Sequence, residues 1–342
     1  MFRNKRYIIS TAIMIAIVIF MTYYKLPYYV YQPGDASALD PVVEVEGGYE
    51  SEGNMHLVTV RGGPATPAYY LWAKIRPHYD IYPIDQVRPE GISHEEYFQT
   101  QLHLMESSQE AATVVAYEAA NKSIEIEYKG VFILSVMDDM PAKDVLQIGD
   151  QIISVDGMKV EQTSELIDYV EGKEEGETVD LTIVRDGVEL TKTVSLASFP
   201  HMPDKIGMGI TLVTDREVEV DPPVNFHSGN IGGPSAGLMF SLEIYDQLTE
   251  GDLTKGYHVA GTGEITYEGE VLRIGGIDKK VVAAHRKGMD IFFAPNENGR
   301  EGSNYEEALK AAEEINTEMK IVPVDSFSDA LHYLEGLEPK SS

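Results

Sequence analysis

The sequence predicts an α+β chain with an N-terminal apolar helix, a β-rich module in the middle and an α+β domain in the C-terminal part. Three observations indicate this division. Uncharged residues run unbroken over 7–24, short strand patterns with Asp-Gly turns fill residues 125–198, and strand and helix patterns alternate over residues 206–338. A further α+β region is expected at residues 42–121, either as a separate unit or as an early part of the C-terminal fold with the middle module inserted into it.

Composition excludes several classes of protein and site. The chain has 342 residues and no cysteine, which excludes disulfides, thiolate metal sites and a cysteine nucleophile. Its formal net charge is −29, and every charge before Asp35 is positive, so the remaining body is still more acidic. Phosphate backbones repel such a body, and we expect no nucleic-acid partner. His94-Glu95 lacks the second histidine of a zinc-protease motif, so no metal and no cofactor are expected.

Residues 7–24 are expected to form a transmembrane helix that anchors the chain. As a helix this uncharged run reaches about 27 Å, close to the apolar thickness of a bilayer. Arg3, Lys5 and Arg6 precede it, so the positive-inside rule places residues 1–6 in the cytoplasm and the body outside, as a single-pass protein of the cell membrane. A cleaved signal peptide is the alternative, but no A-x-A-like site directly follows the run.

The stretch that follows carries no recognisable chemistry. Its patterns predict an extended segment at 26–40, strands at Val42–Gly47 and His56–Arg61, and a helix at Ala68–Arg76. Ser93 has the properties of an N-cap, with Glu96 three residues later, for a helix that runs to about Asn121.

The middle module shows an ordered series of strand, turn and helix signals: Val131–Val136, Gly149-Asp150, Gln151–Val155, Asp156-Gly157, Ser164–Val170, Thr178–Arg185 and Leu190–Leu196. This succession resembles a bacterial PDZ domain. The resemblance implies a groove between the first strand and the helix, in which an extended peptide adds as a strand and contacts Val131, Phe132 and Ile133. A module that only packs against its neighbour and gates access is the alternative.

The C-terminal domain alternates strands and helices. Its patterns predict strands at Ile206–Val213, Glu217–Val220, Tyr257–Gly261, Ile265–Val271, Ile291–Ala294 and Lys320–Val324, and helices at Ser235–Leu248, Asp278–Lys287, Tyr305–Thr317 and Ser328–Leu337.

Two segments of this domain have the residue types of a hydrolytic site. In Gly232-Gly233-Pro234-Ser235-Ala236-Gly237 the glycines allow close approach of a substrate, and Ser235 begins a helix whose free N–H groups suit an oxyanion. In Ile274-Gly275-Gly276-Ile277-Asp278-Lys279-Lys280 a lysine lies in a first helical turn, where the helix dipole and burial both disfavour its charged form. A neutral lysine amine can take the proton of a serine hydroxyl. Taken singly, the serine is a common N-cap and the lysine a common solvated side chain.

Together with Gly261-Thr262-Gly263-Glu264-Ile265, Ala283-Ala284-His285-Arg286 and Ala294-Pro295-Asn296-Glu297-Asn298, these segments resemble the proteolytic domain of Lon-type serine peptidases over residues 229–298. The resemblance implies Ser235 as nucleophile and Lys280 as its base, with Thr262 in support and Gly233, Pro234 and Ala236 around the substrate or oxyanion. The chain as a whole resembles the PDZ-containing, membrane-anchored Lon-like peptidases of Gram-positive bacteria. It departs from the family at Gly232, where an acidic residue usually precedes Gly-Pro-Ser.

The sequence contains no G-x-x-x-x-G-K-[ST] phosphate loop, so no nucleotide partner is expected. We therefore expect an ATP-independent serine endopeptidase that cleaves peptides or unfolded segments outside the cytoplasm. Lon domains often form rings, which makes a homo-oligomer an open alternative to a monomer.

A noncatalytic membrane-bound PDZ adaptor is the rival function. The segment Gly233–Gly237 also fits the nucleophile elbow of an esterase, with His285 or His332 as base, but such an elbow needs a buried strand directly before it. His227 lies in a loop near the motif and has no assigned role.

Overall fold

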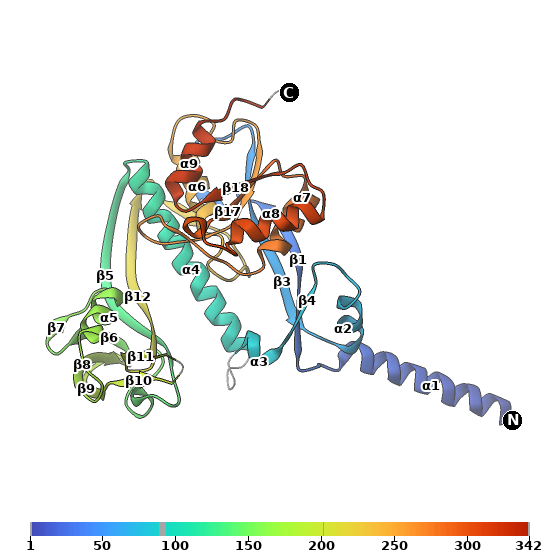
Figure 1. Ribbon diagram of the computed structural model, residues 1–342, viewed down its shortest axis with the longest axis horizontal. Helices are drawn as coiled ribbons and strands as arrows, with labels where there is room; N and C mark the ends of the chain where they lie inside the picture. Colours follow the sequence, from blue (N-terminus) through green and yellow to red (C-terminus); the bar gives the residue numbers. More distant parts are fainter. Residues whose placement is uncertain (1, 89–93, 201, 341–342) are drawn as a thin grey trace. The chain divides into compact units, whose positions relative to one another are not determined.

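The computed structural model describes residues 2–88, 94–200 and 202–340 (Figure 1). The chain divides into two compact units, one made of Met1–Ser123 with Val220–Ser342 and one made of Ile124–Glu219. The second unit is therefore inserted into the first, which is assembled from two stretches far apart in sequence. The N-cap predicted at Ser93 lies outside the described residues.

The first unit contains most of the helices. Its N-terminal stretch forms α1 Phe2–Tyr23, β1 Tyr28–Ala38, β2 Val43–Val45, β3 Asn54–Pro64, α2 Pro67–Ala73, β4 Asp80–Pro83, α3 Ile84–Val87 and α4 His94–Ala119. Its C-terminal stretch forms β13 Val224–Phe226, α6 Gly237–Leu248, β14 His258–Gly261, β15 Glu264–Ile265, β16 Val271–Leu272, α7 Ile277–Lys287, β17 Ile291–Pro295, the 3₁₀ turn Glu297–Gly299, α8 Asn304–Glu314, β18 Lys320–Val324 and α9 Phe327–Glu335.

A mixed six-stranded sheet in the order β18-β17-β14-β3-β1-β4 joins the two stretches of the first unit. Strands β18, β17, β14 and β3 run parallel to one another, whereas β1 pairs antiparallel with both β3 and β4. The pairing of β3 with β14 brings residue 57 beside residue 261. Every residue of β17 is buried, as expected of a parallel strand covered on both faces.

Helices cover both faces of this sheet. On one face α7 and α8 pack on Ala260, Phe292 and Ala294. On the other face α6 brings Met239 close to Gly261, and Tyr333 of α9 stacks edge-on against Phe293 at 5.7 Å between ring centroids. Helix α4 packs along α6, with its inner side formed by the buried residues Met105, Ser108, Ala111, Ala112, Val115 and Ala116. The sheet and the helices on its two faces therefore form the buried core of the first unit.

The second unit is a β-rich module. It contains β5 Ser123–Val136, the 3₁₀ turn Pro141–Asp144, β6 Gln151–Val155, β7 Met158–Lys159, α5 Thr163–Glu171, β8 Thr178–Arg185, β9 Val188–Ser195, β10 Ala197–Phe199, β11 Met202–Gly207 and β12 Ile210–Asp221. The main sheet has the order β12-β5-β6-β8-β9. Its core includes Leu166 of α5, Ile152 and Ile183, and the buried Asp150 carboxylate accepts two 2.6 Å hydrogen bonds from Arg185.

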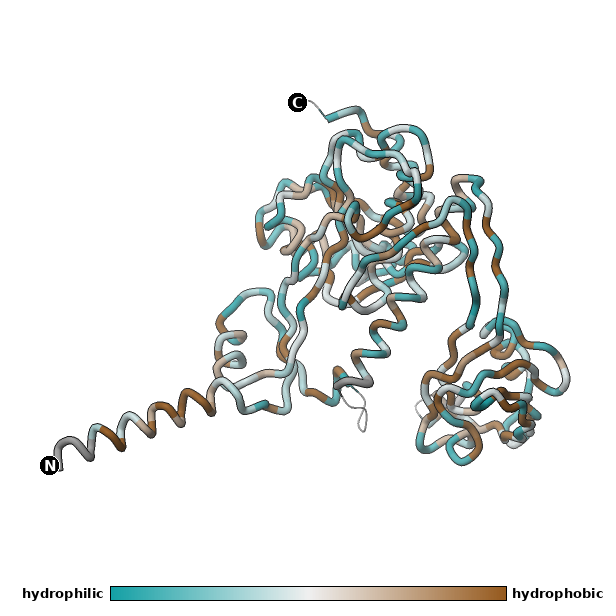
Figure 2. Tube along the Cα trace, turned by 180° about the vertical axis from the view of Figure 1, so that it is seen from behind, coloured by the Kyte–Doolittle hydropathy of each residue, from teal (hydrophilic) through white to brown (hydrophobic). Residues whose placement is uncertain are grey.

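The transmembrane helix predicted at residues 7–24 is not supported. The segment is helical within α1 and its described side chains are exposed and largely apolar (Figure 2). However, no helix in the described part of the chain is long and apolar enough to cross a membrane.

Candidate active site

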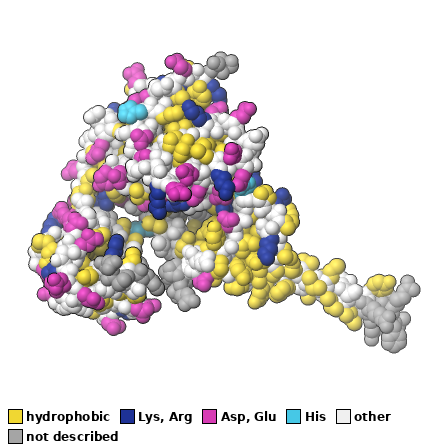
Figure 3. Space-filling model, in the orientation of Figure 1, with side chains coloured by type: hydrophobic (Ala, Val, Ile, Leu, Met, Phe, Trp, Pro, Cys, Tyr) yellow, Lys and Arg dark blue, Asp and Glu magenta, His cyan; other side chains and the backbone are white. Residues whose placement is uncertain are grey.

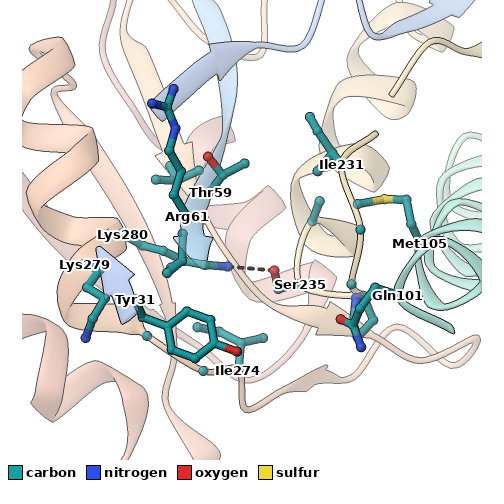
Figure 4. A pocket seen from close by; sticks show the side chains of 18 of the residues that line it. Tyr31, Thr59, Arg61, Gln101, Met105, Ile231, Ser235, Ile274, Lys279 and Lys280 are labelled. Atoms are coloured by element: carbon teal, nitrogen blue, oxygen red, sulfur yellow. Dashed lines mark hydrogen bonds between the residues drawn. The ribbon is translucent and has the colours of Figure 1, made fainter. Parts of the chain in front are cut away.

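A cavity of about 790 Å³ opens in the first unit (Figure 4). Its walls come from β1, β3, β4 and α4 in the N-terminal stretch, and from residues 230–236, residues 273–276 and α7 in the C-terminal stretch. Ser235 and Lys280 both line it, together with the predicted supporting residues Gly233, Pro234 and Ala236. The structure therefore brings into one cavity two segments that are separated by some forty residues of sequence.

Hydrogen bonds to α4 hold the loop that carries Ser235, and the Ser235 side chain does not cap α6. Helix α6 is capped by Ala236, and no side chain makes the capping hydrogen bond, so the Ser235 hydroxyl is not used as an N-cap. The preceding loop is fixed to α4: the Gly233 N–H donates to the Gln101 carbonyl at 2.7 Å, and the Ser108 hydroxyl donates to the Pro234 carbonyl at 2.8 Å. These contacts present the Ser235 hydroxyl to the cavity.

Lys280 reaches the serine from α7. Gly276 adopts a left-handed conformation before the helix, and Lys280 in its first turns is only 3% exposed. Its Nζ lies 2.7 Å from Ser235 Oγ and 2.8 Å from Thr262 Oγ1 (Figure 4). The amine therefore has two hydroxyl partners and is positioned to exchange a proton with the serine.

Burial changes the two adjacent lysines in opposite ways. Removal of Lys280 from water lowers its pKa to about 7, so that a large fraction of the amine is neutral near neutral pH. Burial also acts to lower the pKa of Lys279, but the carboxylates of Asp80 and Asp278 outweigh it and raise that pKa above its usual value. Lys279 is thus a structural cation in an ion-pair cluster, and Lys280 is the lysine suited to accept a proton.

Thr262 forms hydrogen bonds with both Ser235 and Lys280. Its hydroxyl donates to the Ser235 carbonyl at 2.9 Å while it accepts from Lys280 Nζ. The Gly263 N–H donates to the same carbonyl at 3.0 Å. The predicted supporting position of Thr262 therefore has a concrete geometry: it orients both the backbone of the serine and the amine.

Two backbone donors belong to residues that line the cavity. The N–H groups of Ser235 and Ala236 have no acceptor within the residues that the structure describes. They stand at the N-terminal end of α6, where the helix dipole adds positive potential. This arrangement can hold negative charge on an oxygen bound next to Ser235.

Comparison with known families gives two matches. Residues 202–335 match the Lon protease (S16) C-terminal proteolytic domain, and residues 108–196 match the PDZ domain. This chain carries a Lon-type proteolytic domain. A Lon protease of Campylobacter jejuni is 31% identical over 176 residues, which is 45% of this chain and 21% of that protein. A Lon protease of the Aster yellows witches'-broom phytoplasma is 36% identical over 97 residues, 28% of this chain and 11% of that protein.

These Lon-type relatives are much longer than the matched region, since the chain spans about a tenth to a fifth of their length. Among solved structures, the PDZ domain of an SdrC-like protein from Listeria monocytogenes is 37% identical, covering 26% of this chain and 93% of that one, with a TM-score of 0.24. A solution structure from Geobacillus thermodenitrificans is 38% identical, covering 25% of this chain and 98% of that one, with a TM-score of 0.23.

Several residues that shape the Lon-type site were not identified from the sequence. Tyr31, Arg61 and Gln101 line the cavity, and Ser108 fixes the loop before the serine, yet all four precede the matched residues 202–335. No local signal marks them, because their role depends on the sheet and helix contacts that bring the N-terminal stretch beside the C-terminal one. The stretch described above as lacking chemistry thus supplies one wall of the site.

The PDZ groove expected beside Val131–Val136 is not where it was predicted. Val131, Phe132 and Ile133 lie in β5, which is paired with β6 on one side and β12 on the other, and Val131 and Ile133 are core residues. A strand paired on both sides has no free edge for an added peptide. The edge next to the helix belongs to β12, where Thr214 Oγ1 accepts a 3.0 Å hydrogen bond from the N–H of Thr163 in α5.

His227 does not line the cavity of the Lon-type site. Its side chain is exposed and lies 4.0 Å from Glu44, and its N–H donates to the Val42 carbonyl at 2.7 Å. These contacts indicate a role in holding β13 beside β2.

Proposed function

We propose that the chain is an ATP-independent serine endopeptidase in which Ser235 and Lys280 form the catalytic dyad. One observation carries the proposal: a fully buried lysine amine with a pKa lowered to about 7 lies 2.7 Å from the hydroxyl of Ser235 in the wall of a cavity. Such an amine has the geometry and the proton affinity of a general base at neutral pH.

The proposed reaction proceeds in two halves. The neutral Lys280 amine takes the proton of Ser235 Oγ as the oxygen attacks the peptide carbonyl, and the N–H groups of Ser235 and Ala236 stabilise the oxyanion. The protonated amine then donates this proton to the leaving nitrogen, and an acyl-serine remains. In the second half the amine activates a water, which releases the acyl group and restores the serine. Thr262 keeps the amine directed at Ser235 throughout.

Substrates are proposed to be peptides or unfolded segments. The sequence has no nucleotide-binding phosphate loop with which to drive unfolding, so the cavity would receive chains that are already extended. The PDZ unit would bind such chains as an added strand on the free edge of β12, beside α5. Peptides with a photo-crosslinker near a free C-terminus test this assignment: labelled residues in β12 and α5 support it, and labels confined to other strands contradict it.

The first test is cleavage of an unstructured, labelled protein by the full chain without ATP. Wild type is compared with Ser235→Ala and Lys280→Ala, and with Ser241→Ala and Lys287→Ala as matched controls, since Ser241 is buried in α6 and Lys287 is exposed at the end of α7. Loss of cleavage in the first pair alone, with unchanged folding, supports the dyad. Full activity of Lys280→Ala contradicts the lysine base.

Labelling with a serine-directed phosphonate distinguishes the proposed peptidase from the rival noncatalytic PDZ adaptor. We expect covalent labelling at Ser235, read by mass spectrometry, because the hydroxyl is activated by Lys280 even when the correct substrate is unknown. A chain that neither cleaves unfolded proteins nor accepts the label would be a noncatalytic PDZ protein.

We also propose that the peptidase acts outside the cytoplasm. Support comes from the sequence alone: Arg3, Lys5 and Arg6 precede an apolar segment, an arrangement typical of segments that direct export. Protease added to intact cells should then degrade the chain, and protection of the chain until the cells are lysed contradicts the proposal.

A further inference from the structure

The outer side of α2 carries exposed apolar residues that no core requires. Leu71, Trp72 and Ile75 are 57%, 46% and 74% exposed, whereas Ala73 between them is buried against Val30 and Ala65. We call the exposed set Leu71, Trp72, Lys74, Ile75 and Arg76 the α2 face. Thr66 caps α2, so the face belongs to a formed helix and the turn after it. In Figure 3 hydrophobic side chains gather in this part of the first unit, with basic side chains among them.

The charge around the α2 face is opposite to that of the chain. The net charge is −29, yet residues 53–79 contain no acidic residue and carry Arg61, Lys74 and Arg76. The Arg76 guanidinium lies 4.1 Å over the Trp72 ring, and Lys74 Nζ lies 4.9 Å over the ring of Tyr70. Neighbouring elements carry charges of both signs: Asp80 and Asp278 are paired with Lys279, and α3 contains Asp85 and is followed by Arg88.

We propose that the α2 face binds the surface of an anionic lipid bilayer, at the level where headgroups meet acyl chains. Tryptophan and tyrosine favour this level because their rings are apolar and their N–H or O–H groups polar. Lys74 and Arg76 extend from the apolar side chains and can reach lipid phosphates. A strongly acidic body is repelled by the same surface, so this basic corner is the part of the first unit that can approach it.

The adjoining end of α1 fits the same partner. Helix α1 ends beside α2, and Tyr23 and Tyr24 there are 79% and 53% exposed. Lys25 follows directly, and no acidic residue occurs between residue 2 and Gly34. The surface therefore continues from α2 to the end of α1 with the same composition of aromatic and basic residues.

The chain contains one tryptophan, so the fluorescence of Trp72 reports on the α2 face alone. The full chain is mixed with vesicles of phosphatidylcholine, or of phosphatidylcholine with phosphatidylglycerol, in which the acyl chains are brominated. We expect a blue shift and quenching of Trp72 with the anionic vesicles, weakened by salt. Vesicle-bound protein whose Trp72 remains unquenched overturns the proposal, even when α1 holds the chain on the vesicle.

Two double variants test whether the α2 face itself, and not another part of the chain, contacts the vesicles. Leu71→Glu/Ile75→Glu should abolish the quenching, and Lys74→Gln/Arg76→Gln should reduce the preference for phosphatidylglycerol roughly tenfold or more, since each basic residue near such a surface contributes to binding. Leu309→Glu on α8, where the side chain is 42% exposed, is the matched control and should behave as wild type. A concentration-dependent blue shift without vesicles would instead show a second copy covering the face and would overturn the proposal.

Discussion

Lys280 illustrates how a single residue meets two opposing requirements. A general base at neutral pH must be able to lose its proton, and burial achieves this by lowering the pKa of the amine to about 7. The same burial makes the protonated form costly in the folded state. The activity and the stability of the protein should therefore both depend on the titration of this one group.

The pH dependence of cleavage follows from that titration. We expect kcat/KM to rise with pH as Lys280 loses its proton, by close to tenfold per pH unit on the acidic side, and to level off above about pH 7. The measurement is initial cleavage rate from pH 5 to 9 with a peptide that has no titrating groups in this range. A rate independent of pH would exclude Lys280 as the base.

Substitution of Lys280 should stabilise the fold. The pKa is about 7 in the folded protein and 10.5 in the reference state, so the unfolded chain binds more protons between these values and stability increases with pH there. The penalty is present in full below pH 7 and disappears towards pH 10.5. Lys280→Met should therefore raise the free energy of unfolding at pH 7 by about 2–4 kcal/mol. Denaturant titrations at pH 7 and pH 10 check this, because the gain must shrink at the higher pH.

Thr262 should affect turnover more than binding. Thr262→Val keeps the shape but removes the hydroxyl that contacts both Lys280 Nζ and the Ser235 carbonyl. Loss of such a hydrogen bond should lower kcat by roughly ten- to hundredfold with little change in KM. Thr262→Ser restores the hydroxyl and should recover most of the activity. Equal rates for the valine and serine variants would show that the hydroxyl has no positioning role.

Ser235 and Lys280 could be proposed from the sequence because their glycine-rich segments together resemble the Lon-type proteolytic domain, although neither residue stands out when taken singly. Gln101 and Ser108 could not, since they lie in an ordinary helical pattern and matter only where α4 meets the loop before Ser235. The proposed reacting groups lie in short sequence motifs, whereas the groups that hold them are brought there by tertiary contacts.

At the scale of elements, the contact between α4 and the loop before Ser235 sets the position of the serine. A Cβ on Gly232 would lie 2.8 Å from Gln101 Cβ and 3.2 Å from its backbone. Gly232→Ala should therefore push the loop from α4, lower kcat at least tenfold and lower Tm by a few degrees. Gly63→Ala is the control, because a Cβ there meets nothing within 4 Å. Unchanged activity of Gly232→Ala would mean that the loop tolerates this displacement.

Strand patterns predicted which segments extend but not which of them pair. Val131–Val136 was correctly placed in a strand, and its assignment to a groove was wrong because β12, nearly eighty residues later, takes the position beside it. Residues 26–40 were expected only to be extended, since Pro33 and Gly34 interrupt any regular alternation. In the structure β1 covers Tyr28–Ala38 of this segment, with a change of register between Pro33 and Ala36. Hydrophobic alternation does not encode the partner of a strand.

At the scale of the molecule, every residue that lines the cavity belongs to the first unit. Replacement of Ile124–Glu219 by a short Gly-Ser turn should therefore leave a folded peptidase that still labels at Ser235. We expect its rate on a short peptide to change less than about threefold, while its selectivity among unfolded proteins is lost with the PDZ unit. Far-UV circular dichroism controls for folding. A folded deletion variant that no longer labels would show that the PDZ unit is needed to form the site.

The sheet of the first unit also constrains when activity can arise during synthesis. Strand β3 is made early, but its parallel partner β14 and the segments that carry Ser235 and Lys280 emerge from the ribosome only after the whole PDZ unit. A nascent chain that ends before residue 258 cannot complete the sheet, and it lacks Lys280, the proposed base. The order of the chain therefore delays the site: the PDZ unit can fold while the first unit is still unfinished, and the proposed catalytic pair cannot form until Lys280 has been synthesised.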